Sequence, residues 1–114
     1  MMRMWNVDPK MMCDKHLIGE HVEMHMFVGS INKGISIKGY VDKGLLTVNK
    51  LRERHDELAV EMERRHINHL SPLPTFKVVN LNVDQGAVID SKESKKELLR
   101  RCSLCRKQLL KVSA

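Results

Sequence analysis

The stretch "VNKLRERHDELAVEMERR" (residues 48–65) constrains the fold most, because its pattern has the period of an α-helix rather than that of a strand. Positions i, i+3, i+7, i+10 and i+14 form one continuous stripe, made of Val48, Leu51, His55, Leu58 and Met62. Charged residues occupy the opposite face. The stretch therefore predicts an amphipathic helix from about Val48 to Arg65, with Thr47 or Asn49 as its N-cap.

A second helix is predicted from about Asp14 to about Ile31, with Asp14 capping its first turn. Residues 29–44 contain four glycines and predict a flexible basic loop, and residues 69–86 carry two prolines near their start. Within the second segment, "TFKVVNLNV" has the composition of a short strand, but the sequence offers no convincing partner strand. These patterns predict an all-α fold, a compact three-helix single domain over residues 1–114 with long loops.

The third helix is predicted from about Ser91 to Val112. Either Ser94 with Glu97 or Asp90 with Glu93 has the spacing of a capping box. Its apolar stripe consists of Leu98, Cys102, Cys105 and Leu109. On such a stripe cysteine packs as a small hydrophobe. We therefore expect core packing from the Cys-x-x-Cys pair, rather than metal binding or redox chemistry.

Charge is distributed unevenly along the chain. Residues 1–90 hold twelve Lys/Arg and twelve Asp/Glu, whereas residues 91–114 hold eight Lys/Arg and two Asp/Glu. The whole net charge of +6 therefore lies in the predicted C-terminal helix, about 91–112. This asymmetry favours an anionic partner, for which nucleic acid is the usual candidate, although a solvated basic helix face has the same composition.

Several classes of protein are disfavoured by what the sequence lacks. No apolar run approaches the length of about 18 residues that crosses a membrane. The first ten residues contain no apolar core of a secretory signal. Three cysteines are too few for a disulfide framework. We expect a protein of a reducing, cytoplasmic compartment that is not secreted and does not bind a membrane.

The stretch "DKHLIGEHVEMH" (residues 14–25) concentrates three histidines and two glutamates near the N-terminus. On a helix His16, Glu20 and Glu23 fall within about 60° of one another, whereas His21 and His25 point elsewhere. The order "HVEMH" is not the H-E-x-x-H order of metalloproteases, so we expect no metal there. Glu23 shares its face with apolar surface, which predicts a raised pKa and a capacity for proton transfer near neutral pH.

The segments "HLIGEHVE", after a short N-terminal loop, and "LRERHDELAVEMERRHIN" together resemble the pyrimidine-dimer DNA glycosylase and abasic-site lyase family, the phage-type UV-repair endonuclease V. The resemblance extends from about Arg3 to about Pro74. It implies an all-α unit whose N-terminal segment is inserted between the helices. It also implies that the target nucleotide is flipped out of a kinked duplex.

The resemblance further implies the chemistry. In the family an N-terminal α-amine attacks C1′ of the damaged nucleotide and expels the base, and the resulting Schiff base undergoes β-elimination that cuts the strand. Here the amine would belong to Met2, or to Met1 if the chain starts there, and Glu23 falls on the family's catalytic glutamate. An α-amine, with a pKa of about 8, is partly neutral and nucleophilic at physiological pH.

The same resemblance implies the DNA contacts. Arg3 falls on a basic residue at the minor groove and His16 on a histidine near the site. The expected DNA-binding set is completed by Glu20, Lys10 and Lys15, since basic side chains supply the salt-dependent grip on phosphate. The implied partner is duplex DNA with a damaged or abasic nucleotide, bound by a monomer that needs no metal and no other cofactor. The implied location is the cytoplasm of a bacterium or of a virus-infected cell.

Two alternatives stay open. A non-catalytic DNA-binding protein that keeps the family fold is favoured by Val22 and Met26, which stand where the family has arginines, and by the Met-Met start. A small zinc-binding interaction domain would use the three cysteines of the chain, which are Cys13, Cys102 and Cys105.

Overall fold

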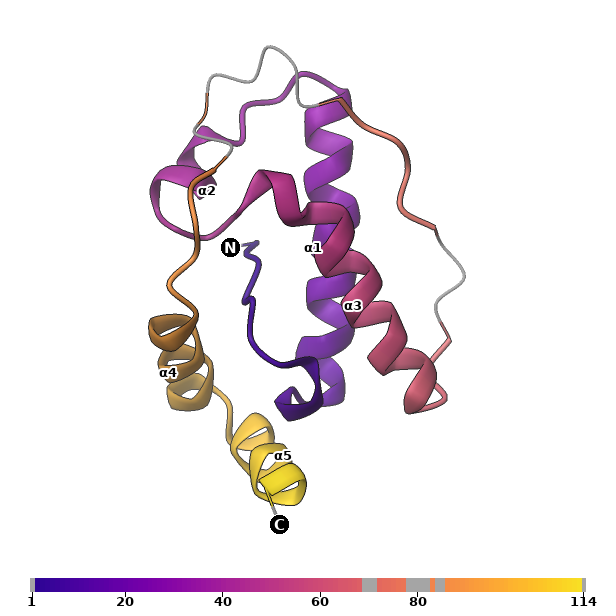
Figure 1. The fold of residues 1–114 in the computed structure, drawn as a ribbon, viewed down its shortest axis with the longest axis vertical. Helices are drawn as coiled ribbons and strands as arrows, with labels where there is room; N and C mark the ends of the chain where they lie inside the picture. The colour runs from indigo at the N-terminus through magenta and orange to yellow at the C-terminus, as the bar shows by residue number, and fades with distance from the viewer. Residues whose placement is uncertain (1, 69–71, 78–82, 84–85, 114) are drawn as a thin grey trace.

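The computed structural model describes residues 2–68, 72–77, 83 and 86–113. Over these residues the chain forms five α-helices, two short 3-10 helices and no strand (Figure 1). The elements are η1 (Pro9–Met11), α1 (Asp14–Asn32), α2 (Lys38–Asp42), η2 (Val48–Lys50), α3 (Leu51–Arg64), α4 (Ser91–Arg101) and α5 (Ser103–Ser113). The all-α prediction is confirmed, but the prediction of three helices is wrong. Most of the stretch with strand-like composition lies outside the described residues.

Two of the differences are a break within a predicted helix and a short helix within a predicted loop. The helix predicted from Ser91 to Val112 is broken at Cys102, which adopts an extended conformation with φ −124° and ψ 109°. No proline or glycine marks this break, so the sequence pattern runs through it. The short α2 lies inside the segment predicted as a loop, and it ends just before Gly44, whose φ of 71° suits glycine.

The helix starts agree with the predictions only in part. Asp90 caps α4, because its carboxylate accepts from two backbone N–H groups of the first turn, as the Asp90 alternative predicted. Cys13, and not Asp14, is the N-cap residue of α1, and no side chain caps it. The α3 start also lacks a side-chain cap, and the hydroxyl of Thr47 accepts instead from the backbone N–H of Ile89 at 3.3 Å.

The packing of α1 against α3 forms the centre of the core. The stripe predicted on the second-helix sequence is buried at all five of its positions, namely Val48, Leu51, His55, Leu58 and Met62. Facing residues of α1 are equally buried, among them Leu17, Met24, Phe27 and Val28. Burial of each large apolar side chain contributes about 1.5–3 kcal/mol. None of the described helices is both long and apolar enough to cross a membrane.

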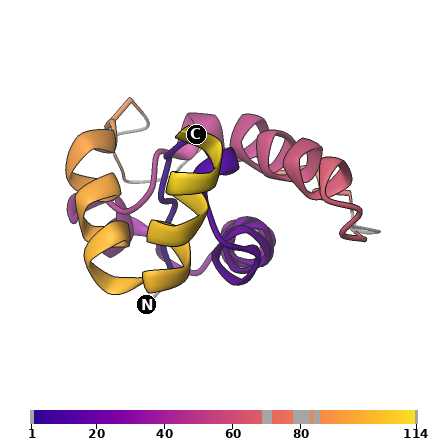
Figure 2. The ribbon, with the colours of Figure 1, turned by 90° about the horizontal axis from the view of Figure 1, so that it is seen from below.

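The two C-terminal helices lie on the other side of α1 from α3, as Figures 1 and 2 both show. The N-terminal segment runs between α4 and the α1–α3 pair (Figure 1). Its residues Met4, Trp5 and Val7 are buried, and the backbone N–H of Met4 donates to the carbonyl of Leu45 at 2.7 Å. At Asn6 the segment turns with φ 55°, a left-handed conformation that asparagine tolerates better than most residues.

Candidate active site

A pocket of about 270 Å³ opens between the first turns of α1 and the N-terminal segment. It is lined by Arg3, Trp5, Lys15, His16, Gly19, Glu20, Glu23 and Arg101. The structure thus brings together most of the side chains that sequence reasoning selected, from two segments and at one place. The exceptions are Lys10, which does not line this pocket, and the two N-terminal methionines, which are considered with Glu23 below.

Glu23 is half-buried in the wall of this pocket. Loss of solvent raises its pKa above that of an ordinary glutamate, the backbone N–H of Arg3 acts as a donor that opposes the rise, and the charge of Glu20 adds to it. Met2 is partly buried against the core and directly precedes Arg3, so its nitrogen lies within about 3.6 Å of the Arg3 nitrogen. Met1 lies outside the described residues. The start of the chain therefore runs beside the Glu23 carboxylate.

Glu20 forms a buried ion pair with Arg54 of α3. The guanidinium donates from Nε at 2.6 Å and from Nη2 at 2.9 Å to the two carboxylate oxygens. Burial opposes the charge of Arg54, but its bonds to Glu20 outweigh this and raise its pKa. Glu20 is only 1% exposed, which favours a structural role, and its expected contact with DNA stays a prediction. The physical reason for the structural role is that Arg54, buried in the core, needs a counter-charge within reach.

Arg3 is held by Trp5 of the N-terminal segment and by Ser94 of α4. Its guanidinium lies 3.9 Å from the centre of the Trp5 ring, and its Nη2 donates to the Ser94 hydroxyl at 3.3 Å. Burial, and the nearby charge of Arg101, lower its pKa. Its Nε is buried and has no hydrogen-bond partner among the residues that the structure describes. Arg3 therefore places a fixed cation in the wall of the pocket, whereas its Nε is shielded from solvent.

Arg101, the last residue of α4, also reaches the pocket and was not singled out from the sequence. Its guanidinium lies 6.0 Å from the centre of the Trp5 ring, which the guanidinium of Arg3 also contacts. The basic composition of the C-terminal segment was the only signal for it, since no local motif distinguishes Arg101 from Arg100 beside it. With Arg3 and Lys15, it makes the rim of the pocket positively charged.

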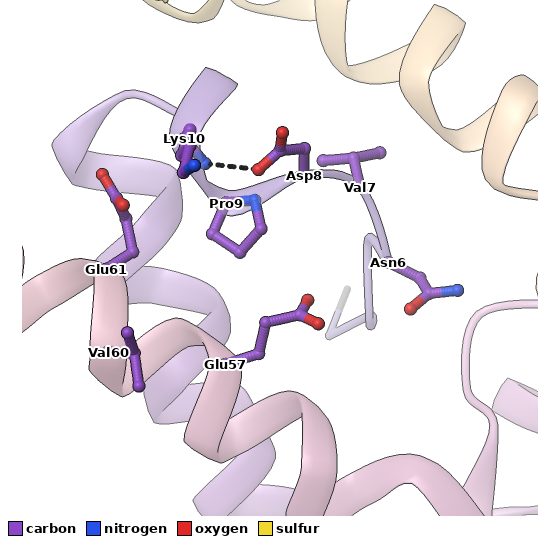
Figure 3. A pocket seen from close by; sticks show the side chains of 8 residues that line it. All are labelled: Asn6, Val7, Asp8, Pro9, Lys10, Glu57, Val60 and Glu61. Atoms are coloured by element: carbon purple, nitrogen blue, oxygen red, sulfur yellow. Dashed lines mark hydrogen bonds between the residues drawn. The ribbon is translucent and has the colours of Figure 1, made fainter.

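A larger hollow of about 480 Å³ lies between the N-terminal segment and α3 (Figure 3). Lys10 lies here, with its backbone N–H bonded to Asp8 at 3.0 Å. The other charged groups that line the hollow are carboxylates, of Asp8, Glu57 and Glu61. The other predicted DNA-binding residues line the smaller pocket and not this hollow, so Lys10 lies apart from them.

His16 belongs both to the pocket and to a cluster of sulfur atoms. Its ring meets Trp5 edge-on, with 6.0 Å between the ring centres. Burial, helped by the charge of Lys15, lowers the pKa of His16. Its Nδ1 lies 3.3 Å from the sulfur of Cys13. The structure therefore gives His16 a second set of neighbours that the helical wheel did not predict.

Two groups of side chains in the described structure hold metal-ligating atoms within 4.8 Å of one another. The first contains Cys13, His16, Cys102 and Cys105, and the second contains His21, His25 and His55. In the second group the Nε2 atoms of His25 and His55 lie 3.2 Å apart. The helical wheel correctly separated His21 and His25 from Glu23. It could not predict their contact with His55, because that contact depends on how α1 packs against α3.

A family model described as pyrimidine dimer DNA glycosylase matches residues 2–75, more than half of the chain. The match includes the N-terminal segment, α1 and α3, and it ends before α4 and α5 begin. No curated protein and no solved structure was found to match the chain.

Proposed function

Because the chain belongs to the pyrimidine dimer DNA glycosylase family, we propose that it excises damaged bases from duplex DNA and cuts the resulting abasic site. The proposed nucleophile is the α-amine at the start of the chain, on Met2 or Met1. The proposed acid–base partner is Glu23. The substrate is a damaged or abasic nucleotide that is flipped out of the duplex, because C1′ is otherwise inaccessible to the amine.

The observation that carries this proposal is the position of Glu23 beside the backbone of Arg3. A chain that begins at Met2 has its amine one residue from that contact, within about 3.6 Å of the Arg3 nitrogen. An α-amine has a pKa of about 8, so part of it is neutral at physiological pH. A carboxyl group with a raised pKa next to such an amine can exchange protons with the reacting sugar.

The proposed reaction has four steps. The amine attacks C1′, and the bond from C1′ to the base breaks as the base leaves. Opening of the sugar ring then forms an imine between C1′ and the amine nitrogen, with Glu23 giving a proton to the ring oxygen. Loss of a proton from C2′ expels the 3′ phosphate by β-elimination. Hydrolysis of the imine releases the amine for another cycle.

The charge of the pocket rim supports binding of a phosphate backbone. Arg3, Lys15 and Arg101 lie around the pocket. Cations at fixed positions bind phosphate by releasing counter-ions, which makes affinity depend steeply on salt. His16 lies beside them, and Trp5 holds the two guanidinium groups in place. This set is proposed to seat the strand so that C1′ faces the amine.

The test is borohydride trapping on a duplex with one abasic site. We expect a covalent adduct that mass spectrometry maps to the first residue of the mature chain, which also shows whether that residue is Met1 or Met2. Glu23→Gln should lower the cleavage rate by about 10²-fold or more. Glu53→Gln, an exposed glutamate of α3 outside the pocket, is the matched control and should cleave normally. An adduct in a chain with a blocked N-terminus, or normal cleavage by Glu23→Gln, contradicts the mechanism.

One observation favours a second candidate, a protein that binds DNA without cutting it. Ile18, Val22 and Met26 follow one another at i,i+4 spacing on α1 and are 38%, 48% and 50% exposed. In this candidate the protein has lost catalysis, because Val22 and Met26 of this apolar stripe stand where the family has arginines. It predicts salt-sensitive DNA binding with no strand scission and no trapped adduct, and binding that is unchanged in Glu23→Gln.

A further inference from the structure

Four metal-ligating side chains from two distant parts of the chain meet at the start of α1. Cys13 is the N-cap residue of α1 and His16 lies in its first turn, whereas Cys102 separates α4 from α5 and Cys105 lies in the first turn of α5. Their donor atoms all lie within 4.8 Å of one another. A sequence separation of 89 residues between Cys13 and Cys102 means that the tertiary fold, and not a local turn, brings the two pairs together.

The distances between these atoms fit a tetrahedral ion. The sulfurs of Cys13 and Cys102 are 3.8 Å apart, and the Nδ1 of His16 lies 3.3 Å from the Cys13 sulfur and 3.8 Å from the Cys105 sulfur. With Zn–S near 2.3 Å and Zn–N near 2.0 Å, the edges of a tetrahedron are about 3.5 to 3.8 Å long. A disulfide would need about 2.05 Å between sulfurs, and all three cysteines are free.

The spacing and the hydrogen bonds also suit a structural metal site. Cys13 and His16 form one short-spaced pair, and Cys102 and Cys105 form the other, an arrangement of two pairs that structural zinc sites use. The backbone N–H of Cys13 donates to the Cys105 sulfur at 3.3 Å, and that of Cys105 donates to the Cys102 sulfur at 3.4 Å. Such donors offset the negative charge that thiolates carry when they bind a metal.

The burial of the cluster distinguishes it from a surface coincidence. The three cysteines are buried and His16 is half-buried, which matches the closed environment of a structural zinc site rather than the open position of a catalytic one. Buried cysteines that serve only as small hydrophobes need no histidine nitrogen between them. Here the nitrogen faces two of the three sulfurs.

We propose that Cys13, His16, Cys102 and Cys105 bind one zinc ion that fastens α4 and α5 to the start of α1. The two helices lie outside the residues that the family model matches, and α4 carries both Arg101 of the pocket rim and Ser94, which bonds to Arg3. The ion therefore holds the C-terminal extension where it completes the pocket. This inference does not depend on whether the pocket is catalytic.

The first test is the zinc content of the purified full chain under reducing conditions. We expect about one zinc per chain. Removal of the ion with a strong chelator should lower the Tm, and added zinc should restore it. A metal-free chain that takes up no zinc, or a disulfide between Cys13 and Cys102 in the freshly purified protein, overturns the proposal.

Substitution of the zinc by Co²⁺ separates this site from the three-histidine group. Cobalt bound by thiolates has a charge-transfer band in the near ultraviolet, whereas cobalt bound by His21, His25 and His55 has none. We expect the band in the parent chain, its loss or strong decrease in Cys105→Ser, and an unchanged band in His25→Ala. Metal binding that survives Cys105→Ser and is lost in His25→Ala contradicts the proposed ligands.

A substitution that keeps a metal ligand at position 16 distinguishes loss of the ligand from unfolding of the variant. His16→Cys keeps a donor at this position and turns the first pair into Cys-x-x-Cys, so it should retain about one zinc and strengthen the cobalt–thiolate band. His16→Ala removes the donor and should bind zinc at least tenfold more weakly. Equal zinc affinity in His16→Ala and the parent excludes His16 as a ligand.

Discussion

Glu20 and Glu23 lie three residues apart on α1, yet their surroundings differ. Glu20 is enclosed with Arg54 and is held by two hydrogen bonds from its guanidinium. Glu23 is half-buried at the pocket wall, and no described residue forms an ion pair with it. The wheel could place both on one face, but it could not tell them apart, because Arg54 comes from another helix.

Removal of the Glu20 charge should destabilise the fold strongly. Glu20→Gln leaves Arg54 buried without its main counter-charge, so the free energy of unfolding should fall by about 3 kcal/mol or more. Glu57→Gln is the matched control, because Glu57 contacts the same arginine but its side chain is 49% exposed, and it should cost less than about 1 kcal/mol. Urea unfolding of both variants measures the difference. Equal losses would mean that burial does not determine how much each ion pair contributes to the free energy of unfolding.

Removal of the Glu23 charge should leave the fold at least as stable as before. Burial raises the pKa of Glu23, so the folded state binds this proton more tightly than the unfolded chain does. The stabilisation is fully present below the ordinary pKa of the carboxyl and is lost as the pH rises through the raised pKa. At neutral pH the ionised group opposes folding. The Tm of Glu23→Gln at pH 7 should therefore equal or exceed that of the parent, and the gap should close at acid pH.

The helix α4 acts as a clamp on the N-terminal segment. The buried hydroxyl of Ser94 donates to the carbonyl of Trp5 and accepts from Arg3. One turn earlier, the Ser91 hydroxyl accepts from the amide of Asn6 at 3.1 Å in an exposed position. The clamp depends on where α4 begins, and Asp90 fixes this start as the N-cap residue. It also depends on the break at Cys102, which separates α4 from α5.

The two serines of this clamp should differ in importance. Ser94→Ala leaves the Trp5 carbonyl buried without a donor, which should cost about 1–3 kcal/mol of stability and displace Arg3 from the pocket. Ser91→Ala, at the exposed position, should stay within about 0.5 kcal/mol of the parent. Denaturant unfolding measures the cost, and the DNA affinity of each variant reports on Arg3. An affinity that is unchanged in Ser94→Ala would show that the clamp does not position Arg3.

The charge of the molecule is concentrated in its C-terminal part, but the fold brings only some of it to the pocket. Arg100 and Arg101 are neighbours that both pair with Glu97 at 2.5 Å. Arg101 lines the pocket beside Trp5, whereas Arg100 does not. The net charge of +6 therefore predicts an anionic partner, and the tertiary arrangement determines which cations can touch it.

The salt dependence of DNA binding should separate the two arginines. If Arg101 contacts a phosphate, the decrease of log K with log salt should be less steep in Arg101→Gln, by about 0.9 in slope. Arg100→Gln removes the same charge from the same segment and should change the slope much less. Fluorescence anisotropy at several salt concentrations measures both. Equal slopes in the two variants would place the DNA elsewhere on the basic surface.

Local pattern was enough for the all-α class, the buried stripe of α3 and the face shared by His16 and Glu23, because each depends on neighbours within about four residues. For the cap of α4 it left two alternatives, of which the structure has Asp90. The break at Cys102, the pair of Glu20 with Arg54, the approach of Arg101 to Trp5 and the meeting of Cys13 with Cys102 depend on contacts between distant segments. Such contacts exist only once the helices have packed, and no local period encodes them. The sequence, through its resemblance to the family, thus predicted roles for Glu23 and the N-terminal amine, and only helix packing determined which side chains surround Glu23.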